Sequence, residues 1–269
     1  MGNGRVGAYG FTFENLSDAE DWLQPTPPSW PRAAVSQTVG PPAVFESRIG
    51  NESADIVLMG GFSLSVRRED NDICFTGPSR LSTAALIHPY LAPAASVLAR
   101  WNGWAAFHAG VFEVDGQAWL VTADRNGGKS TTLALLSELE LPVLADDLAV
   151  VRGGCALAGP RSVDLREKGG FSHAEDLGVV GERRRWRLRL PPTELEMRVV
   201  GVIKLTWSDV PTVRSVSIED RPDVLRPMLS ISVEPSAMLQ VLGLPTFVVG
   251  RPRGDLQASV DLIRKVTDQ

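Results

Sequence analysis

Short apolar runs with a period of two residues dominate the first third of the chain. Strands are predicted at residues 8–13, 55–59, 62–67 and 72–76, and Gly60-Gly61 and Asp70-Asn71 supply turns between the later ones. Prolines within 24–31 and at 41–42 exclude long helices there. The pattern predicts a small β-rich module over residues 1–93.

The pattern changes at about residue 94. Apolar residues at helical spacing over 94–104 predict a helix, and Asp115-Gly116 between two apolar runs predicts a hairpin of strands 111–114 and 118–122. A helix is then predicted from 129 to 139, and a last one over 255–266. Further strands are predicted at 142–151, 183–189, 199–207 and 246–250. Alternating strands and helices indicate an α/β domain over residues 94–269.

Composition and charge narrow the class of protein. The 269 residues include 43% hydrophobic ones, enough for a substantial core, and the formal net charge is −5. This acidity argues against a protein that coats nucleic acid or an anionic membrane. Cys74 and Cys155 lie far apart, so neither a zinc site nor a disulfide framework is expected.

Two segments bear on localisation. Residues 1–10 contain one arginine and no apolar run, so we expect no secretory signal. The uncharged run 81–99 is interrupted by His88, Pro89 and Pro93, which favours a buried loop and helix over a bilayer span. We therefore expect a soluble, cytoplasmic protein.

The pattern A-x-x-x-x-G-K-S joins the hairpin to the following helix. Together with the residue that follows it, the pattern covers Ala123, Asp124, Arg125, Asn126, Gly127, Gly128, Lys129, Ser130 and Thr131. A loop of this kind points backbone N–H groups at phosphates, at the positive end of a helix. Lys129 would contact the β- and γ-phosphates and Ser130 would hold Mg²⁺. Ala123 stands where the usual pattern has glycine. The alternative interpretation of the whole segment is a turn that leads into a helix by chance and binds no phosphate.

Two further features surround this loop. Asp146 and Asp147 interrupt the apolar run 142–151, where adjacent acids are costly to bury without partners. They could meet a metal and a substrate, or form a solvated turn at a strand end. His108 precedes the loop by fifteen residues and, taken alone, would be read as a core histidine.

The combination of these motifs resembles the HPr serine kinase/phosphorylase family. His108-Ala109-Gly110, the hairpin, Gly128-Lys129-Ser130 and Ala145-Asp146-Asp147 match it without a gap. The segment is more similar still to the HPr-kinase-like tailoring kinases of ribosomally made, lasso-type peptides. Where that family usually has Gly, Ser and Gly, this chain has Ala123, Arg125 and Asn126.

The resemblance implies a phosphate-loop kinase domain of the phosphoenolpyruvate-carboxykinase/HPr-kinase type behind the β-rich module. It implies ATP or GTP with Mg²⁺, and a serine-type hydroxyl on a peptide or small protein as acceptor. Lys129 would bind the phosphates, Ser130 and Asp147 the metal, and Asp146 would be the catalytic base. His108 would line the site.

Arginines downstream add candidate contacts. Arg161 could stabilise phosphoryl charge or form a surface salt bridge with Asp164. Arg185, Arg187 and Arg189 would share one face of an edge strand, which suits phosphate or an acidic peptide. A merely solvated edge strand is the alternative.

The sequence therefore supports an ATP-dependent serine kinase of a peptide or small protein. The alternative is a non-catalytic nucleotide-binding regulator or peptide-binding module with a degenerate loop. Neither nucleic acid nor membrane is expected as a partner, and a homo-oligomer stays open.

Overall fold

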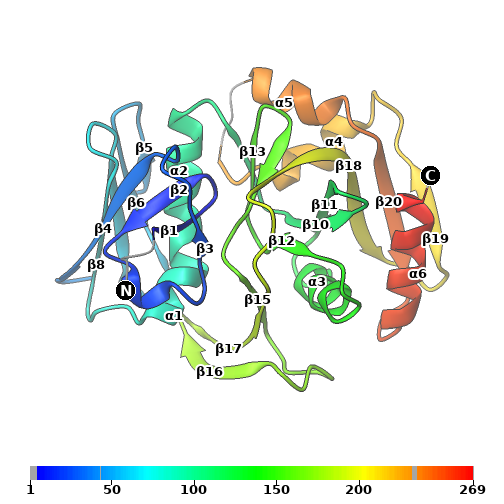
Figure 1. Cartoon of the computed structure of the whole chain (residues 1–269), viewed down its shortest axis with the longest axis horizontal. Helices are drawn as coiled ribbons and strands as arrows, with labels where there is room; N and C mark the ends of the chain where they lie inside the picture. The colour runs from blue at the N-terminus through cyan, green and yellow to red at the C-terminus, as the bar shows by residue number, and fades with distance from the viewer. Residues whose placement is uncertain (1–4, 43, 232–234, 269) are drawn as a thin grey trace.

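The computed structural model describes residues 5–42, 44–231 and 235–268, and shows a mixed α/β fold with three sheets. The N-terminal sheet lies on one side of the molecule and a larger mixed sheet on the other (Figure 1). Residues 1–4 of the segment judged to lack a secretory signal are outside the described residues.

The N-terminal sheet has eight strands in the order β3-β1-β2-β4-β8-β7-β6-β5. Their bounds are β1 Val6–Ala8, β2 Phe11–Glu14, β3 Gln24–Pro25, β4 Arg32–Val39, β5 Arg48–Ile49, β6 Ser53–Val57, β7 Ser63–Arg67 and β8 Asp72–Gly77. The strand predicted over 8–13 is wrong in one respect. Tyr9 and Gly10 have φ of 60° and 87°, so a turn divides it into β1 and β2.

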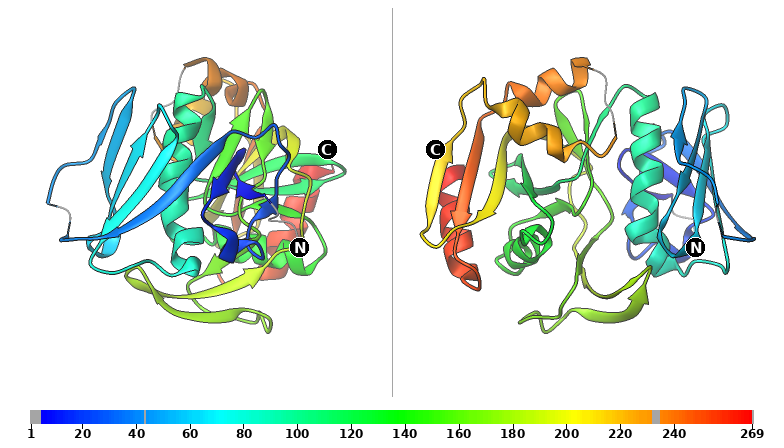
Figure 2. Two further views of the ribbon diagram at one scale, coloured as in Figure 1. Left: turned by 60° about the vertical axis from the view of Figure 1, so that its left-hand side comes forward. Right: turned by 180° about the vertical axis from the view of Figure 1, so that it is seen from behind.

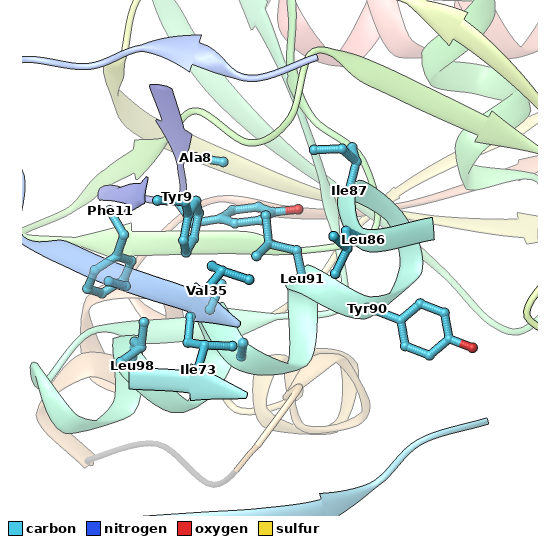
Figure 3. Close-up of a cluster of buried hydrophobic side chains, with 14 of the residues drawn as sticks. Ala8, Tyr9, Phe11, Val35, Ile73, Leu86, Ile87, Tyr90, Leu91 and Leu98 are labelled. Atoms are coloured by element: carbon cyan, nitrogen blue, oxygen red, sulfur yellow. The ribbon is translucent and has the colours of Figure 1, made fainter. Parts of the chain in front are cut away.

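The helix α2 (Leu91–Trp101) packs its apolar face against this sheet. Leu91 and Leu98 are fully buried with Phe11 and Ile73 from the strands (Figure 3). Seen from behind, α2 lies between the N-terminal sheet and the rest of the chain (Figure 2). The run 81–99 is therefore a buried loop and helix, as predicted, with α1 (Thr83–Ala85) and η3 (Leu86–Tyr90) before α2.

The second sheet has nine strands, with β12-β10-β11-β18-β14-β13-β9 as its main path. The bounds are β9 Ala105–Phe107, β10 Gly110–Val114, β11 Gln117–Ala123, β12 Val143–Ala145, β13 Ala149–Arg152, β14 Cys155–Leu157, β18 Glu196–Trp207, β19 Thr212–Ser215 and β20 Thr246–Arg251. The long strand β18 pairs in parallel with both β11 and β20. The predicted hairpin is present as β10 and β11.

Alternation along β11 assigns the two faces of this sheet. Trp119 and Val121 join a core with α3 (Lys129–Glu138) and α6 (Leu256–Thr267). Ala118 and Leu120 join a core on the opposite face, which residues of α4 (Arg221–Leu225), η4 (Arg226–Met228) and α5 (Pro235–Leu242) cover. Both faces of β11 are buried, which explains its continuous apolar sequence.

A third, three-stranded sheet reaches across beneath both halves of the molecule (Figure 1). It contains β15 (Ser162–Leu165), β17 (Arg183–Arg189) and β16 (Glu175–Val180), with β17 in the middle. The expectation that 183–189 forms an edge strand is therefore wrong, because β17 pairs on both sides.

Two shorter helical turns complete the secondary structure, η1 (Ser17–Ala19) and η2 (Met59–Gly61). None of the helices in the described ranges has the length and hydropathy that a transmembrane span needs.

Candidate functional site

The phosphate-loop pattern lies between the carboxyl end of β11 and the amino end of α3. Asn126 and Gly128 have left-handed backbones, with φ of 65° and 79°. Asparagine is among the residues that tolerate this conformation best. Ala123 lies within β11 and is absent from the positive-φ residues, so glycine is not required there. A Cβ on Gly127 would lie 2.6 Å from the Cβ of Ala123. Glycine is therefore required at position 127 rather than at position 123.

Side chains from distant strands hold the outside of this loop. The Nε1 of Trp207 donates to the carbonyl of Asn126 at 3.2 Å, and Nη2 of Arg251 donates to that of Gly127 at 2.7 Å. The Arg251 guanidinium also stacks on the Trp207 ring, 4.4 Å from its centroid. Burial lowers the pKa of Arg251 to about 10. Tertiary contacts therefore shape a loop whose own sequence contains few glycines.

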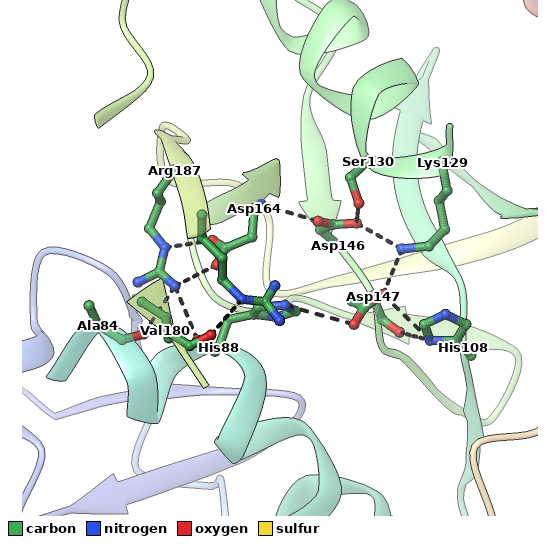
Figure 4. A network of polar contacts seen from close by, with 11 residues as sticks. Ala84, His88, His108, Lys129, Ser130, Asp146, Asp147, Asp164, Val180 and Arg187 are labelled. Carbon is green, nitrogen blue, oxygen red and sulfur yellow. Dashed lines mark hydrogen bonds and ion pairs between the residues drawn. The ribbon is translucent and has the colours of Figure 1, made fainter. Parts of the chain in front are cut away.

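Lys129 is the centre of a buried polar network (Figure 4). Its Nζ donates to Oδ1 of Asp146 at 2.8 Å and to Oδ1 of Asp147 at 3.1 Å. Ser130 Oγ donates to the same Asp146 oxygen at 3.0 Å. Although burial opposes the charge, the two carboxylates raise the pKa of Lys129. The ammonium group therefore stays charged at the start of α3, where a phosphate would also find free backbone N–H groups.

The two aspartates have different surroundings. Asp146 is buried, and its Oδ2 accepts a hydrogen bond from the backbone N–H of Asp164 at 3.3 Å. The Asp147 side chain is 33% exposed and lines a cleft. Asp147 has φ of 70°, which breaks the predicted strand into β12 and β13 and turns this side chain toward the cleft.

Two histidines flank the Asp147 carboxylate. His108 Nδ1 lies 3.5 Å from Oδ1 and 3.0 Å from the Asp147 backbone carbonyl. His88 Nε2, from the N-terminal module, lies 3.9 Å from Oδ2. Burial opposes ionisation, but Lys129, His88 and His108 hold the pKa of Asp147 well below its usual range. The carboxylate is therefore charged in the free chain.

The arginines do not form the single exposed row that the sequence suggested. Arg187 is 1% exposed and binds Asp164 through two hydrogen bonds of 2.6 and 2.8 Å. Its Nη2 also donates to the carbonyls of Ala84 and His88 (Figure 4). In this position Arg187 is a structural residue, and a phosphoryl-acceptor substrate in the cleft cannot contact it.

Arg189 and Arg161 also point elsewhere. Arg189 pairs with Asp21 at 2.7 Å and stacks on Trp22. Arg161 donates to the carbonyl of Leu190 and is not part of the cleft lining, and its expected partner Asp164 is taken by Arg187. Three arginines of β17 were candidate contacts for the acceptor. Arg185 lines the cleft, whereas Arg187 and Arg189 do not.

A cleft of about 980 Å³ brings the remaining candidates together. All eight residues of the phosphate-loop pattern line it, with Thr131, His108 and Asp147. It also contains residues that the sequence interpretation missed as site residues: His88, Arg166, Arg183 and Lys204. The signal for His88 was a titratable residue in an otherwise uncharged run, and the signal for Arg166 was its position directly after the strand that carries Asp164.

The predicted magnesium ligands Ser130 and Asp147 have different neighbours in the structure. The described residues contain no group of three or more His, Cys, Asp or Glu side chains arranged for a metal ion. Mg²⁺ in nucleotide sites commonly takes one or two protein oxygens and completes its shell with phosphates and water. Ser130 Oγ and Asp146 Oδ1 are adjacent, whereas Asp147 contacts Lys129 and the histidines. The structure thus pairs Ser130 with Asp146 rather than with Asp147.

Comparisons with known proteins find similarity among solved structures alone. No family model matches the sequence, and no curated protein matches it. Among solved structures, the chain is similar to the HPr(Ser) kinase/phosphatase from Coxiella burnetii at 13% identity and a TM-score of 0.35, covering 60% of this chain and 90% of that one. A similarity at this level carries no argument about function, and none of these findings bears on peptide-tailoring kinases.

Proposed function

We propose that the chain is an ATP-dependent kinase that transfers a phosphoryl group to a serine-type hydroxyl on a peptide or small protein. The observation that carries the proposal is the network of Lys129, Ser130, Asp146 and Asp147 at the start of α3. Phosphoryl transfer depends mainly on positioning and on stabilising charge. A lysine and a hydroxyl at the start of the helix after the loop pattern, with two carboxylates in contact with the lysine, supply both.

The surroundings of the two aspartates support a division of roles. Asp146, buried beside the Ser130 hydroxyl, would hold Mg²⁺ together with Ser130, and the ion would neutralise phosphate charge. Asp147 faces the cleft and would accept the proton of the acceptor hydroxyl, because a base must lie within hydrogen-bond reach of its substrate. This assignment exchanges the roles that the motif resemblance gave to the two residues.

Nucleotide binding is the first test. At a ligand concentration of 100 Kd, binding to the native state alone adds about 2.7 kcal/mol to stability, which raises Tm by roughly 5 °C or more in a chain of this size. We expect such a shift for ATP or GTP with Mg²⁺, and its loss in Lys129→Met. Lys168→Met, which removes a lysine that stacks on Trp186, is the control and should keep the shift. Absence of a shift for both nucleotides in the wild type would refute the proposal.

A nucleotide-binding module without turnover is the second candidate. Its support is that both carboxylates bind Lys129 in the free chain, so phosphates must compete for the only lysine in the loop pattern. Transfer of a γ-labelled phosphoryl group from ATP to serine peptides separates the two candidates. Nucleotide-dependent stabilisation without transfer to any peptide tried would favour the module.

A further inference from the structure

Four arginines line the cleft beside the phosphate loop. Arg125 belongs to the loop, Arg166 follows β15, and Arg183 and Arg185 lie on β17. In the described part of the chain, none of the four lies within 4.0 Å of a carboxylate oxygen, although other arginines of the same hairpin do. Arg166 donates to Oδ1 of Asn126, and Arg185 Nε donates to the carbonyl of Val180 at 3.4 Å.

The carboxylates of the cleft are mostly engaged by other cations. Asp124 pairs with Lys204, Asp147 with Lys129, and Asp164 with Arg187. Glu182 accepts a hydrogen bond from the backbone N–H of Gly60. Glu167 is the further acidic side chain of the lining. Four arginines therefore face two carboxylates, which leaves a local excess of positive charge in an acidic protein.

The other three guanidinium groups act on Arg166. Burial, and after it the charges of Arg183, Arg125 and Arg185, lower the pKa of Arg166. Like charges gathered without counterions repel, and a bound oxyanion relieves that repulsion through charge-assisted hydrogen bonds. Arginine suits carboxylate and phosphate groups because its planar fork binds two oxygens at once.

The four arginines extend from the phosphate loop toward the N-terminal strands. Arg166 bonds to Asn126 of the loop, whereas the turn before Arg183 packs on the N-terminal module. A Cβ on Gly181 in that turn would lie 3.0 Å from the sulfur of Met59 and 3.6 Å from the hydroxyl of Tyr90. The cleft volume of about 980 Å³ is at the upper end for a small-molecule site, so space remains beside a nucleotide.

Building on the kinase function proposed above, we propose that Arg166, Arg183 and Arg185 form a second anion subsite, which binds carboxylate or phosphate groups that the acceptor carries near its hydroxyl. The acceptor is thus an acidic molecule. The phosphate loop and Lys129 serve the nucleotide at one end of the cleft, and the arginines of β17 hold the acceptor at the other.

The test uses the full chain and fluorescent serine peptides whose neighbours are either glutamate or glutamine. We expect the glutamate peptide to bind at least 10-fold more tightly than the glutamine peptide, with and without ADP. The double variant Arg183→Gln/Arg185→Gln should lose this preference. Arg184→Gln, on the same strand but exposed and paired with Asp176, is the matched control and should keep it. In parallel, calorimetry with pyrophosphate tests a phosphate-bearing acceptor.

The outcomes separate this inference from the kinase proposal. Arginine-dependent binding of either probe supports the subsite and tells whether carboxylates or phosphates are recognised. Equal binding of the two peptides with pyrophosphate binding that is absent or unchanged in the double variant, no binding of any probe, or an equal loss in Arg184→Gln overturns it. A 10-fold loss of ADP affinity in the double variant, with the peptide preference intact, assigns the arginines to the nucleotide and overturns it too. Failure of the wild type to bind ADP refutes the kinase proposal, and the measurements without ADP still decide the subsite.

Discussion

Replacing Asp147 by asparagine tests the division of roles between the two aspartates. The substitution keeps the size of the side chain, removes its charge and leaves a group that cannot accept the acceptor proton. In the free chain it removes a 3.1 Å ion pair with Lys129 and the contact with His108 at 3.5 Å. Lys129 keeps its 2.8 Å bond to Asp146, so the phosphate-binding cation stays in position.

The magnitude follows from these contacts. A positioned general base contributes about 10²- to 10⁴-fold to the rate, so transfer should fall by at least ~10²-fold, equivalent to about 2.7 kcal/mol of transition-state stabilisation. Mg-nucleotide affinity should change by less than about 10-fold, because Ser130, Asp146 and the loop are intact. Asp146→Asn should give the opposite pattern, with weaker Mg-dependent nucleotide binding, because its carboxylate adjoins the Ser130 hydroxyl.

Single-turnover transfer of labelled phosphoryl groups and calorimetric nucleotide binding measure the two effects separately. Each variant should be assayed across a range of Mg²⁺ concentrations, since a lost metal ligand is partly compensated by more metal and a lost base is not. The reasoning is refuted if Asp147→Asn transfers at the wild-type rate, or if it loses nucleotide binding while Asp146→Asn keeps it.

Two further predictions concern stability. Arg187→Met leaves the buried Asp164 carboxylate without its cation and should lower the unfolding free energy, measured in urea, by about 3–5 kcal/mol. Arg189→Met removes an exposed pair and should lower it by less than about 1 kcal/mol. Equal losses in the two variants would contradict this reasoning. The lowered pKa of Asp147 means that the folded chain holds this proton less tightly than the unfolded chain, so its contribution is present above about pH 4 and lost as pH falls toward the folded pKa. Unfolding free energies from pH 7 to 2.5 should fall less steeply in Asp147→Asn, and an unchanged slope would show that another group causes the acid sensitivity.

Local patterns predicted the elements well where local forces decide them. The hairpin at Asp115-Gly116 and the helix after Gly128 follow from turn chemistry and periodicity, and both are present. The division of 142–151 into two strands depends on the left-handed backbone of Asp147, which an apolar pattern does not reveal. The domain boundary at residue 93 stays a prediction, although α2 shares its core with the N-terminal sheet.

The sequence predicted which residues form the loop of the candidate site, but it did not predict the side-chain contacts between distant residues. The nine loop residues are contiguous in sequence, so a pattern could find them. Arg187 and Arg189 have the same spacing as an exposed row, yet Asp164 and Asp21, 23 and 168 residues away, take them as partners. His88 reaches the site only because the N-terminal module packs there. Pairing over such separations is a tertiary property that periodicity cannot supply.

The hydrogen bonds of Arg187 connect the segment before α2 to the network around Lys129. Asp146 accepts from Asp164, Asp164 binds Arg187, and Arg187 donates to carbonyls of Ala84 and His88. A fragment cut at residue 93 would retain every residue of the phosphate loop, but Arg187 would lose two acceptors and Asp147 a neighbouring histidine. Changes in the backbone path of residues 84–88 would therefore reach Asp146 through Arg187 and Asp164, without any change in the loop itself.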